Sequence, residues 1–101
     1  MKIIWTDFAS KMLREIYDYH KTTAGYKTAV KIKKNIFSST NRLINHPEMG
    51  QLEPYLMKFN ENHRYIVEAN YKIIYKKINE SILILDIFDT RQNPDKLDRN
   101  V

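Results

Sequence analysis

The sequence predicts an α+β domain in which a two-helix hairpin covers one face of an antiparallel sheet. Two observations define this class. Apolar residues recur at helical spacing in the first half of the chain, whereas segments rich in β-branched and aromatic residues fill the second half. Prolines and a glycine between residues 46 and 54 separate the halves. A chain of 101 residues is expected to form a single domain spanning residues 1–101, because two cores would each bury too little surface.

The first elements are a short strand at residues 2–5 and a helix directly after it. Thr6 or Asp7 can cap this helix, because a side-chain oxygen at that position accepts a hydrogen bond from a free backbone N–H. Gly25 is expected to end it. Its apolar side chains repeat every three or four residues, and they are Phe8, Met12, Leu13, Ile16 and Tyr19.

Residues 26–45 are expected to form the second helix and to fold back on the first. Two rows of apolar side chains return every seven residues: Ala29, Ile36, Leu43 and Val30, Phe37, Ile44. Lys27, Lys31 and Lys34 share a face away from most of them, and no acidic residue lies between Tyr26 and Asn45. This cationic face could attract an acidic partner such as nucleic acid, an acidic protein segment or a membrane surface. The alternative is a solvated helix surface.

The second half predicts strands at residues 64–68, 71–77 and 82–88, joined as an antiparallel meander, with a short edge-like run at 55–59. Pro94 can begin a last helical turn. If Ile78 pairs with Ile82, the face toward the helices carries Ile73, Tyr75, Leu83, Leu85 and Ile87. The opposite face then carries Arg64, Lys72, Lys76 and Phe88, with Arg91 at the strand end, and a one-residue slip would exchange the faces.

The basic residues of that opposite face are the candidate site. Arg64, Lys72, Lys76 and Arg91 could bind a phosphate-bearing target through charge and forked hydrogen bonds. Crowded cations also lower the pKa of a lysine, which could make a lysine of this set a general base. The alternative is that these cations only solvate a half-buried sheet. The strand tyrosines could likewise stack on bases or pack in the core, and they are Tyr65, Tyr71 and Tyr75.

Several classes of chemistry have no support in the sequence. The absence of cysteine excludes disulfides, thiolate metal sites and a cysteine nucleophile. No glycine-rich phosphate loop or metal-ligand spacing is present, so we expect no cofactor and no metal. His20, His46 and His63 lie in unlike contexts typical of surface or capping residues. No apolar run is long enough for a signal peptide or a membrane span, so we expect a cytoplasmic protein that does not contact membranes.

Four segments, in order, resemble the RelE/ParE superfamily, the toxins of bacterial type II toxin–antitoxin pairs. Leu13, Ile16 and Tyr19 resemble its first-helix pattern, and residues 41–50 resemble the "i..L...P..G" stop after the second helix. Residues 64–67 with 71–75, and then 82–91, resemble its strands and the arginine that ends the last of them. The resemblance covers about residues 8–97, and the two-helix hairpin is most similar to the ParE branch.

This resemblance implies a growth-inhibiting toxin that a cognate antitoxin neutralises. ParE-like members inhibit DNA gyrase, and this is the expected function. The alternative is RelE-like cleavage of messenger RNA on the ribosome, a metal-independent reaction that uses basic residues and usually a C-terminal Tyr or His. Arg64 and Arg91 stand where two such residues would fall, whereas Lys72 replaces an arginine and Leu97 lies near the expected tyrosine. The resemblance therefore makes Arg64, Lys72 and Arg91 the catalytic candidates.

Two further expectations concern partners. The resemblance implies that an acidic antitoxin would complement the face formed by Lys27, Lys31 and Lys34. In this superfamily the antitoxin carries the DNA-binding part, so the resemblance also implies that DNA contact by this chain is indirect. The third functional hypothesis needs no toxicity at all: a basic module that binds RNA or an acidic protein.

Overall fold

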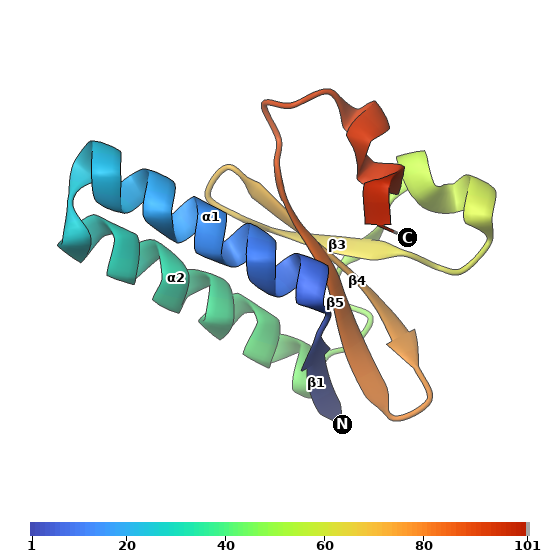
Figure 1. Cartoon of the computed structure of the whole chain (residues 1–101). Coiled ribbons are helices and arrows are strands. Elements are labelled where there is room, and N and C mark those ends of the chain that lie inside the picture. Colours follow the sequence, from blue (N-terminus) through green and yellow to red (C-terminus); the bar gives the residue numbers. More distant parts are fainter. Residues whose placement is uncertain (101) are drawn as a thin grey trace.

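The computed structural model describes residues 1–100 as a five-stranded sheet with a helical hairpin packed on one face (Figure 1). The elements follow in the order β1 (Lys2–Trp5), α1 (Asp7–Ala24), α2 (Tyr26–Asn41), η1 (Arg42–Ile44), β2 (Gln51–Leu52), η2 (Pro54–Phe59), β3 (Arg64–Glu68), β4 (Tyr71–Ile78), β5 (Ser81–Asp89) and η3 (Pro94–Asn100), where η denotes a 3₁₀ helix. The predicted order of strand, two helices and antiparallel strands is confirmed.

The sheet has the strand order β1-β5-β4-β3-β2. β3, β4 and β5 pair antiparallel, as the meander predicts. β2, in a connector where no strand was expected, pairs antiparallel with β3, and β1 pairs parallel with β5. The parallel pair makes the sheet mixed, because α1 and α2 carry the chain across the sheet before the meander begins. No helix within residues 1–100 has the length and apolarity needed to cross a membrane.

Local hydrogen bonds set the limits of the hairpin as predicted. The Thr6 hydroxyl accepts a hydrogen bond from the Ala9 N–H at 3.1 Å, which caps α1. Gly25 ends α1 with φ of 98°, a conformation that residues with a Cβ rarely adopt. The chain then reverses directly into α2.

The edge-like run predicted at residues 55–59 is wrong, because these residues form η2. Pro54 occupies the first helical position, and the Glu53 carboxylate accepts a hydrogen bond from the Tyr55 N–H at 3.1 Å. Together they start a helix where a strand was expected.

The register between β4 and β5 also differs from the prediction. Ile78 lies opposite Ser81, not Ile82. Farther along, Tyr75 pairs with Ile84 and Ile74 with Asp86, so β5 holds one extra residue at a β-bulge.

The bulge decides which side chains reach the helices. Ile73, Tyr75 and Ile87 pack on the helix side, as predicted. Leu83 and Leu85 were predicted to join them, and this was wrong: both pack on the opposite side of the sheet. A strict two-residue alternation cannot hold through a strand that contains an extra residue.

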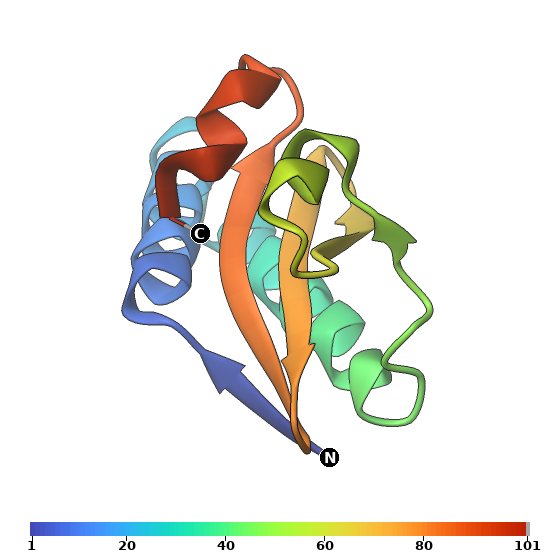
Figure 2. The ribbon, with the colours of Figure 1, turned by 90° about the vertical axis from the view of Figure 1, so that its right-hand side faces the viewer.

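The structure therefore has a core on each side of the sheet. The helix-side core is the larger, with Ala9, Leu13, Ile36, Leu43, Ile66, Tyr71, Ile73, Tyr75, Ile82, Ile84 and Ile87 buried. The opposite core consists of Leu56, Ile74, Leu85, Phe88 and Leu97. Figure 2 shows why the second core exists: η2 and η3 lie over the sheet face that the helices leave open. An ion pair between Lys58 and Asp98, at 3.1 Å, connects these two short helices.

Candidate functional site

Arg64 lies on the helix side of the sheet, not on the outer face where it was predicted. It is directly opposite Tyr75 in the β3–β4 ladder, and cross-strand partners project to the same face. Its guanidinium donates to the backbone oxygen of Gly50 at 2.7 Å and to that of Glu48 at 3.5 Å. Arg64 therefore fastens the loop between η1 and β2 to the sheet.

Lys72 and Lys76 lie on the opposite face, as predicted, but each is paired with a carboxylate. Lys72 Nζ is 2.6 Å from Glu53 Oε1 and 4.3 Å from the centre of the Tyr65 ring. Lys76 Nζ is 2.6 Å from Glu61 Oε1, and this contact lowers the pKa of Glu61. The two ammonium groups hold the segment around η2 against the sheet.

Arg91 stands beyond the end of β5 and makes a two-pronged contact with Asp89. Its Nε lies 3.0 Å from Asp89 Oδ1 and its terminal nitrogen 2.7 Å from Oδ2. This hydrogen-bonded contact holds the pKa of Asp89 below its ordinary value. The Arg91 side chain remains 61% exposed, so one edge of the guanidinium can still meet a partner.

The four predicted site residues thus do not form one surface. Arg64 faces the helix side, Lys72 and Lys76 face the side that η2 and η3 cover, and Arg91 lies at the end of the sheet. A two-residue turn explains the error for Arg64. Glu68 pairs with Tyr71 across this turn, and counting back four residues on β3 and forward four on β4 sets Arg64 against Tyr75. The two residues between the predicted strands at 64–68 and 71–77 could have revealed this pairing from the sequence.

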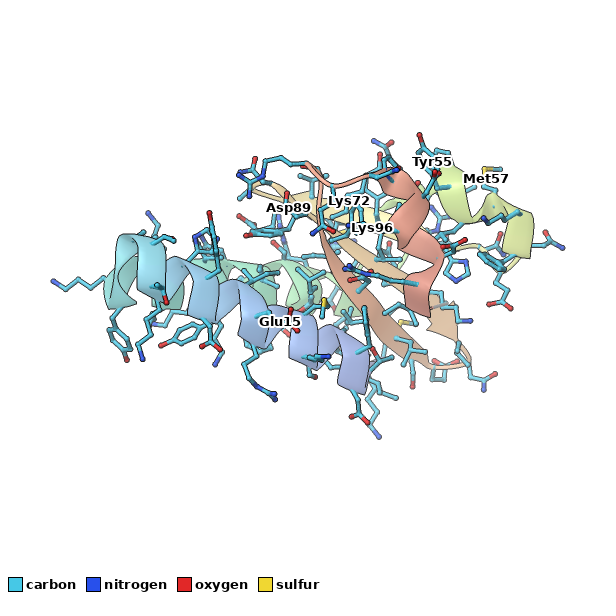
Figure 3. All side chains as sticks on the ribbon, turned by 45° about the horizontal axis from the view of Figure 1, so that its top comes forward. Glu15, Tyr55, Met57, Lys72, Asp89 and Lys96 are labelled. Carbon is cyan, nitrogen blue, oxygen red and sulfur yellow. The ribbon has the colours of Figure 1, made fainter. Side chains whose placement is uncertain are left out.

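Arg91 lines a surface cleft of about 360 Å³ between α1 and the end of β5. Figure 3 shows Glu15 on α1 and Asp89 at the end of β5, the two elements that border it. The cleft is lined by Met12, Glu15, Ile16, Tyr19, Tyr71, Ile87, Asp89, Arg91, Gln92 and Arg99. Apolar side chains with charges of both signs suit a macromolecular contact better than a run of phosphates.

A histidine–tyrosine contact, which the sequence did not suggest, borders this region. His20 Nε2 lies 2.8 Å from the Tyr71 hydroxyl, and Tyr71 is nearly buried. Burial raises the pKa of Tyr71, and the neighbouring Asp89 raises it further. The Tyr71 hydroxyl is therefore neutral, and its contact with His20 joins β4 to α1. His20, predicted to be a surface or capping residue, thus has a structural role.

His63 and Leu97 are core residues. The His63 side chain is fully buried, and neither ring nitrogen has a hydrogen-bond partner within the described chain. Leu97, near the position where the superfamily resemblance places a tyrosine, is 1% exposed and packs from η3 into the core on the side of the sheet opposite the helices.

Lys27, Lys31 and Lys34 are exposed on α2, on the side away from the buried Ala29 and Ile36, as predicted. We call these three residues the lysine stripe. Within residues 1–100 no carboxylate forms an ion pair with any of them. The same part of the chain contains no cluster of three or more side chains of the metal-binding types His, Cys, Asp and Glu.

The comparisons with known proteins agree with this architecture. A solved structure from the chromosomal ParDE toxin–antitoxin system of P. aeruginosa superimposes with a TM-score of 0.72, covering 88% of this chain and 95% of the other at 22% identity. No curated protein sequence matches the chain. A helical hairpin on this five-stranded sheet is thus a ParE-like fold.

The family follows from the sequence match. The family model described as the ParE toxin of the type II toxin–antitoxin system parDE matches residues 3–94. The chain belongs to this family, and ParD is the antitoxin partner that membership implies.

Proposed function

We propose that this ParE toxin inhibits DNA gyrase by binding to it, without catalysing a reaction, and that a ParD antitoxin neutralises it by binding the toxin. The observation that carries the proposal is the family match over residues 3–94. The resemblance to the ParE branch and the two-helix hairpin support it as well.

The state of the basic residues argues against the alternative of RNA cleavage. A metal-independent nuclease needs unpaired cations and a general acid or base close to one phosphate. Here Lys72, Lys76 and Arg91 are each paired with a carboxylate, and Arg64 donates to backbone oxygens on the other side of the sheet. Arg64, Lys72 and Lys76 hold neighbouring loops against the sheet, and no reacting phosphate could contact all four residues at once.

We assign the cleft beside Arg91 to contact with gyrase. Of the three predicted site residues that are paired with a carboxylate, Arg91 has the most exposed side chain, with 61% exposure against 22% for Lys72 and 19% for Lys76. Its guanidinium is held in a fixed orientation by Asp89, and the apolar side chains of Met12, Ile16 and Tyr19 lie nearby in the same cleft. A preorganised arginine beside apolar side chains is typical of residues that dominate protein interfaces.

The test uses the purified full chain in two assays run in parallel. In the first, gyrase supercoiling is measured at rising toxin concentration; we expect inhibition and accumulation of cleaved DNA. In the second, messenger RNA on stalled ribosomes is examined for cleavage; we expect intact message. Unaffected supercoiling at excess toxin would overturn the proposal, and cut message would replace it with the nuclease function. Inducing the gene with and without its antitoxin gene tests for toxicity, because a non-toxic binding module would cause no growth defect.

A further inference from the structure

Most of the unpaired positive charge in residues 1–100 lies on α1 and α2. Five of the eight Lys and Arg residues after position 50 have a carboxylate within 4.0 Å, and they are Lys58, Lys72, Lys76, Arg91 and Arg99. In the described chain, no Lys or Arg before position 51 has such a partner. The field of the protein is therefore strongest on the helical side.

The lysine stripe concentrates this charge along one line of α2. Lys27, Lys31 and Lys34 follow one another at helical spacing, opposite the side that packs on the sheet. At 1.5 Å per residue they span about 10 Å, which corresponds to roughly three base-pair steps of duplex DNA at 3.4 Å each. Ser38, one turn farther along, is also exposed and adds a hydroxyl donor to the same face.

The composition of this face favours a polyanion over a folded protein. A protein interface needs an apolar centre surrounded by polar groups. The stripe and Ser38 provide only ammonium groups and a hydroxyl. The exposed aromatic residues of α2 are Tyr26, its first residue, and Phe37, which lies around the helix against Trp5, and neither stands at a stripe position. We propose that the lysine stripe binds the phosphate backbone of duplex DNA directly and without sequence preference.

The outer face of α1 provides a contrast within the same hairpin. Its exposed cations are Lys11, Arg14 and Lys21, and the exposed acids Glu15 and Asp18 lie between them. Opposite charges in alternation cancel at a distance, so this face attracts DNA weakly. The two helices therefore offer a matched pair of variants: three cations can be removed from either one with the same change in net charge.

This inference differs from the expectation that only the antitoxin contacts DNA, and it goes beyond the gyrase proposal. Binding to bare duplex requires neither gyrase nor ParD. A toxin held on DNA by its stripe would be concentrated on the polymer that gyrase itself acts upon.

The experiment measures binding of the purified full chain to a labelled duplex of about 20 base pairs by fluorescence anisotropy, between about 50 and 200 mM salt. Each phosphate contact contributes about 0.9 to the slope of log affinity against log salt, so the triple variant Lys27→Gln, Lys31→Gln, Lys34→Gln should lose between about 2 and 3 from that slope. Its affinity at the lowest salt should fall by at least about tenfold. The control Lys11→Gln, Arg14→Gln, Lys21→Gln should change the slope by less than about one.

Several outcomes would overturn the inference. One is an unchanged slope in the stripe variant; another is an equal loss in both triple variants, since net charge alone would then explain the binding. A third is loss of ParD binding with DNA binding intact, which would make the stripe a protein-docking face. Circular dichroism checks that both variants stay folded, as the exposure of all six side chains leads us to expect.

The supercoiling assay separates this inference from the gyrase proposal. A stripe variant that loses DNA binding but still inhibits gyrase supports the inference and leaves the gyrase proposal intact. Wild-type toxin that binds DNA with the expected slope but leaves supercoiling unaffected supports the inference and removes the gyrase proposal alone.

Discussion

Lys72 and Glu53 form an ion pair in which the two partners differ sharply in exposure. Lys72 Nζ is 2.6 Å from Glu53 Oε1, and the Glu53 side chain is completely buried while that of Lys72 is 22% exposed. The other carboxylate oxygen of Glu53 accepts the Tyr55 N–H at the start of η2. The pair therefore connects η2 to β4 on the sheet face opposite the helices, where the sequence predicts the target-binding site.

The unequal exposure predicts unequal costs of mutation. Lys72→Met leaves a buried carboxylate without its cation and should lower the free energy of unfolding by about 3 kcal/mol. Glu53→Gln keeps an acceptor for the Tyr55 N–H and lets Lys72 turn toward water, so it should cost only about 1 kcal/mol.

Urea unfolding of the two single variants and of the double variant checks this asymmetry. The double variant should be more stable than Lys72→Met alone, because it removes the unpaired charge. Equal losses in the two single variants would show that the buried carboxylate is not the costly partner.

A second prediction concerns the proline and glycine in the loop after the helices. The Tyr75 hydroxyl donates to the Pro47 backbone oxygen at 2.9 Å and accepts the Gly50 N–H at 3.0 Å. A Cβ on Gly50 would lie 2.6 Å from that hydroxyl and 2.6 Å from the Tyr65 backbone oxygen. Gly50→Ala should therefore cost about 1–3 kcal/mol in unfolding free energy, because the backbone must move.

The companion variant Tyr75→Phe removes the hydroxyl and leaves the Gly50 N–H buried without this partner, at a cost of about 1–3 kcal/mol. Met49→Ala, at an exposed position of the same loop, is the control and should change the urea midpoint little. If Gly50→Ala unfolds at the wild-type urea concentration, the close approach to Tyr75 does not constrain the loop.

The helices could be predicted from the sequence because their signals are local. Thr6 offers its cap to a residue three positions away, and Gly25 ends α1 through its own φ angle. The signals that start η2 are also local, since Glu53 caps it and Pro54 is its first residue. It was nevertheless predicted as an edge-like run, because the apolar residues that follow resemble a strand.

The face of the sheet that a side chain occupies depends on how strands pair, which involves residues on different strands. Lys72 and Lys76 were placed correctly because alternation within one strand is fixed. Leu85 was misplaced because a bulge in β5 is not visible in a two-residue pattern, and Arg64 because its face depends on the register across a turn. The prediction of a single basic surface was wrong because the register of β3 was not worked out, although each basic residue had been identified.

Stability should fall in mild acid because of His63. Burial lowers the pKa of His63, the Lys76 cation lowers it further, and Glu61 opposes this. The unfolded chain takes up a proton near the ordinary pKa of 6.5, whereas the folded chain resists it, so stability is lost as pH falls below about 6.5. The slope contributed by one histidine can reach at most about 1.4 kcal/mol per pH unit.

His63→Phe should flatten the dependence of stability on pH between about pH 5 and 7, measured by urea unfolding. The lowered pKa of Glu61 does not interfere, because its contribution is lost only below its ordinary value of 4.5. His46→Gln, at an exposed position, is the control and should keep the wild-type slope. A His63→Phe variant with the wild-type slope would assign the acid sensitivity to another group.

The last prediction tests the cleft through Arg91. The Arg91 side chain is mostly exposed, and water can hydrate the Asp89 carboxylate when the guanidinium is removed. Arg91→Ala should therefore leave the urea midpoint unchanged. If the cleft contacts gyrase, the same variant should need at least about tenfold more toxin for equal inhibition of supercoiling. Lys77→Ala, an exposed cation on β4 outside the cleft, should inhibit as the wild type does. Because Arg91→Ala stays folded, full inhibition by this variant would locate the gyrase contact elsewhere, and inhibition lost equally in Lys77→Ala would indicate dependence on net charge alone.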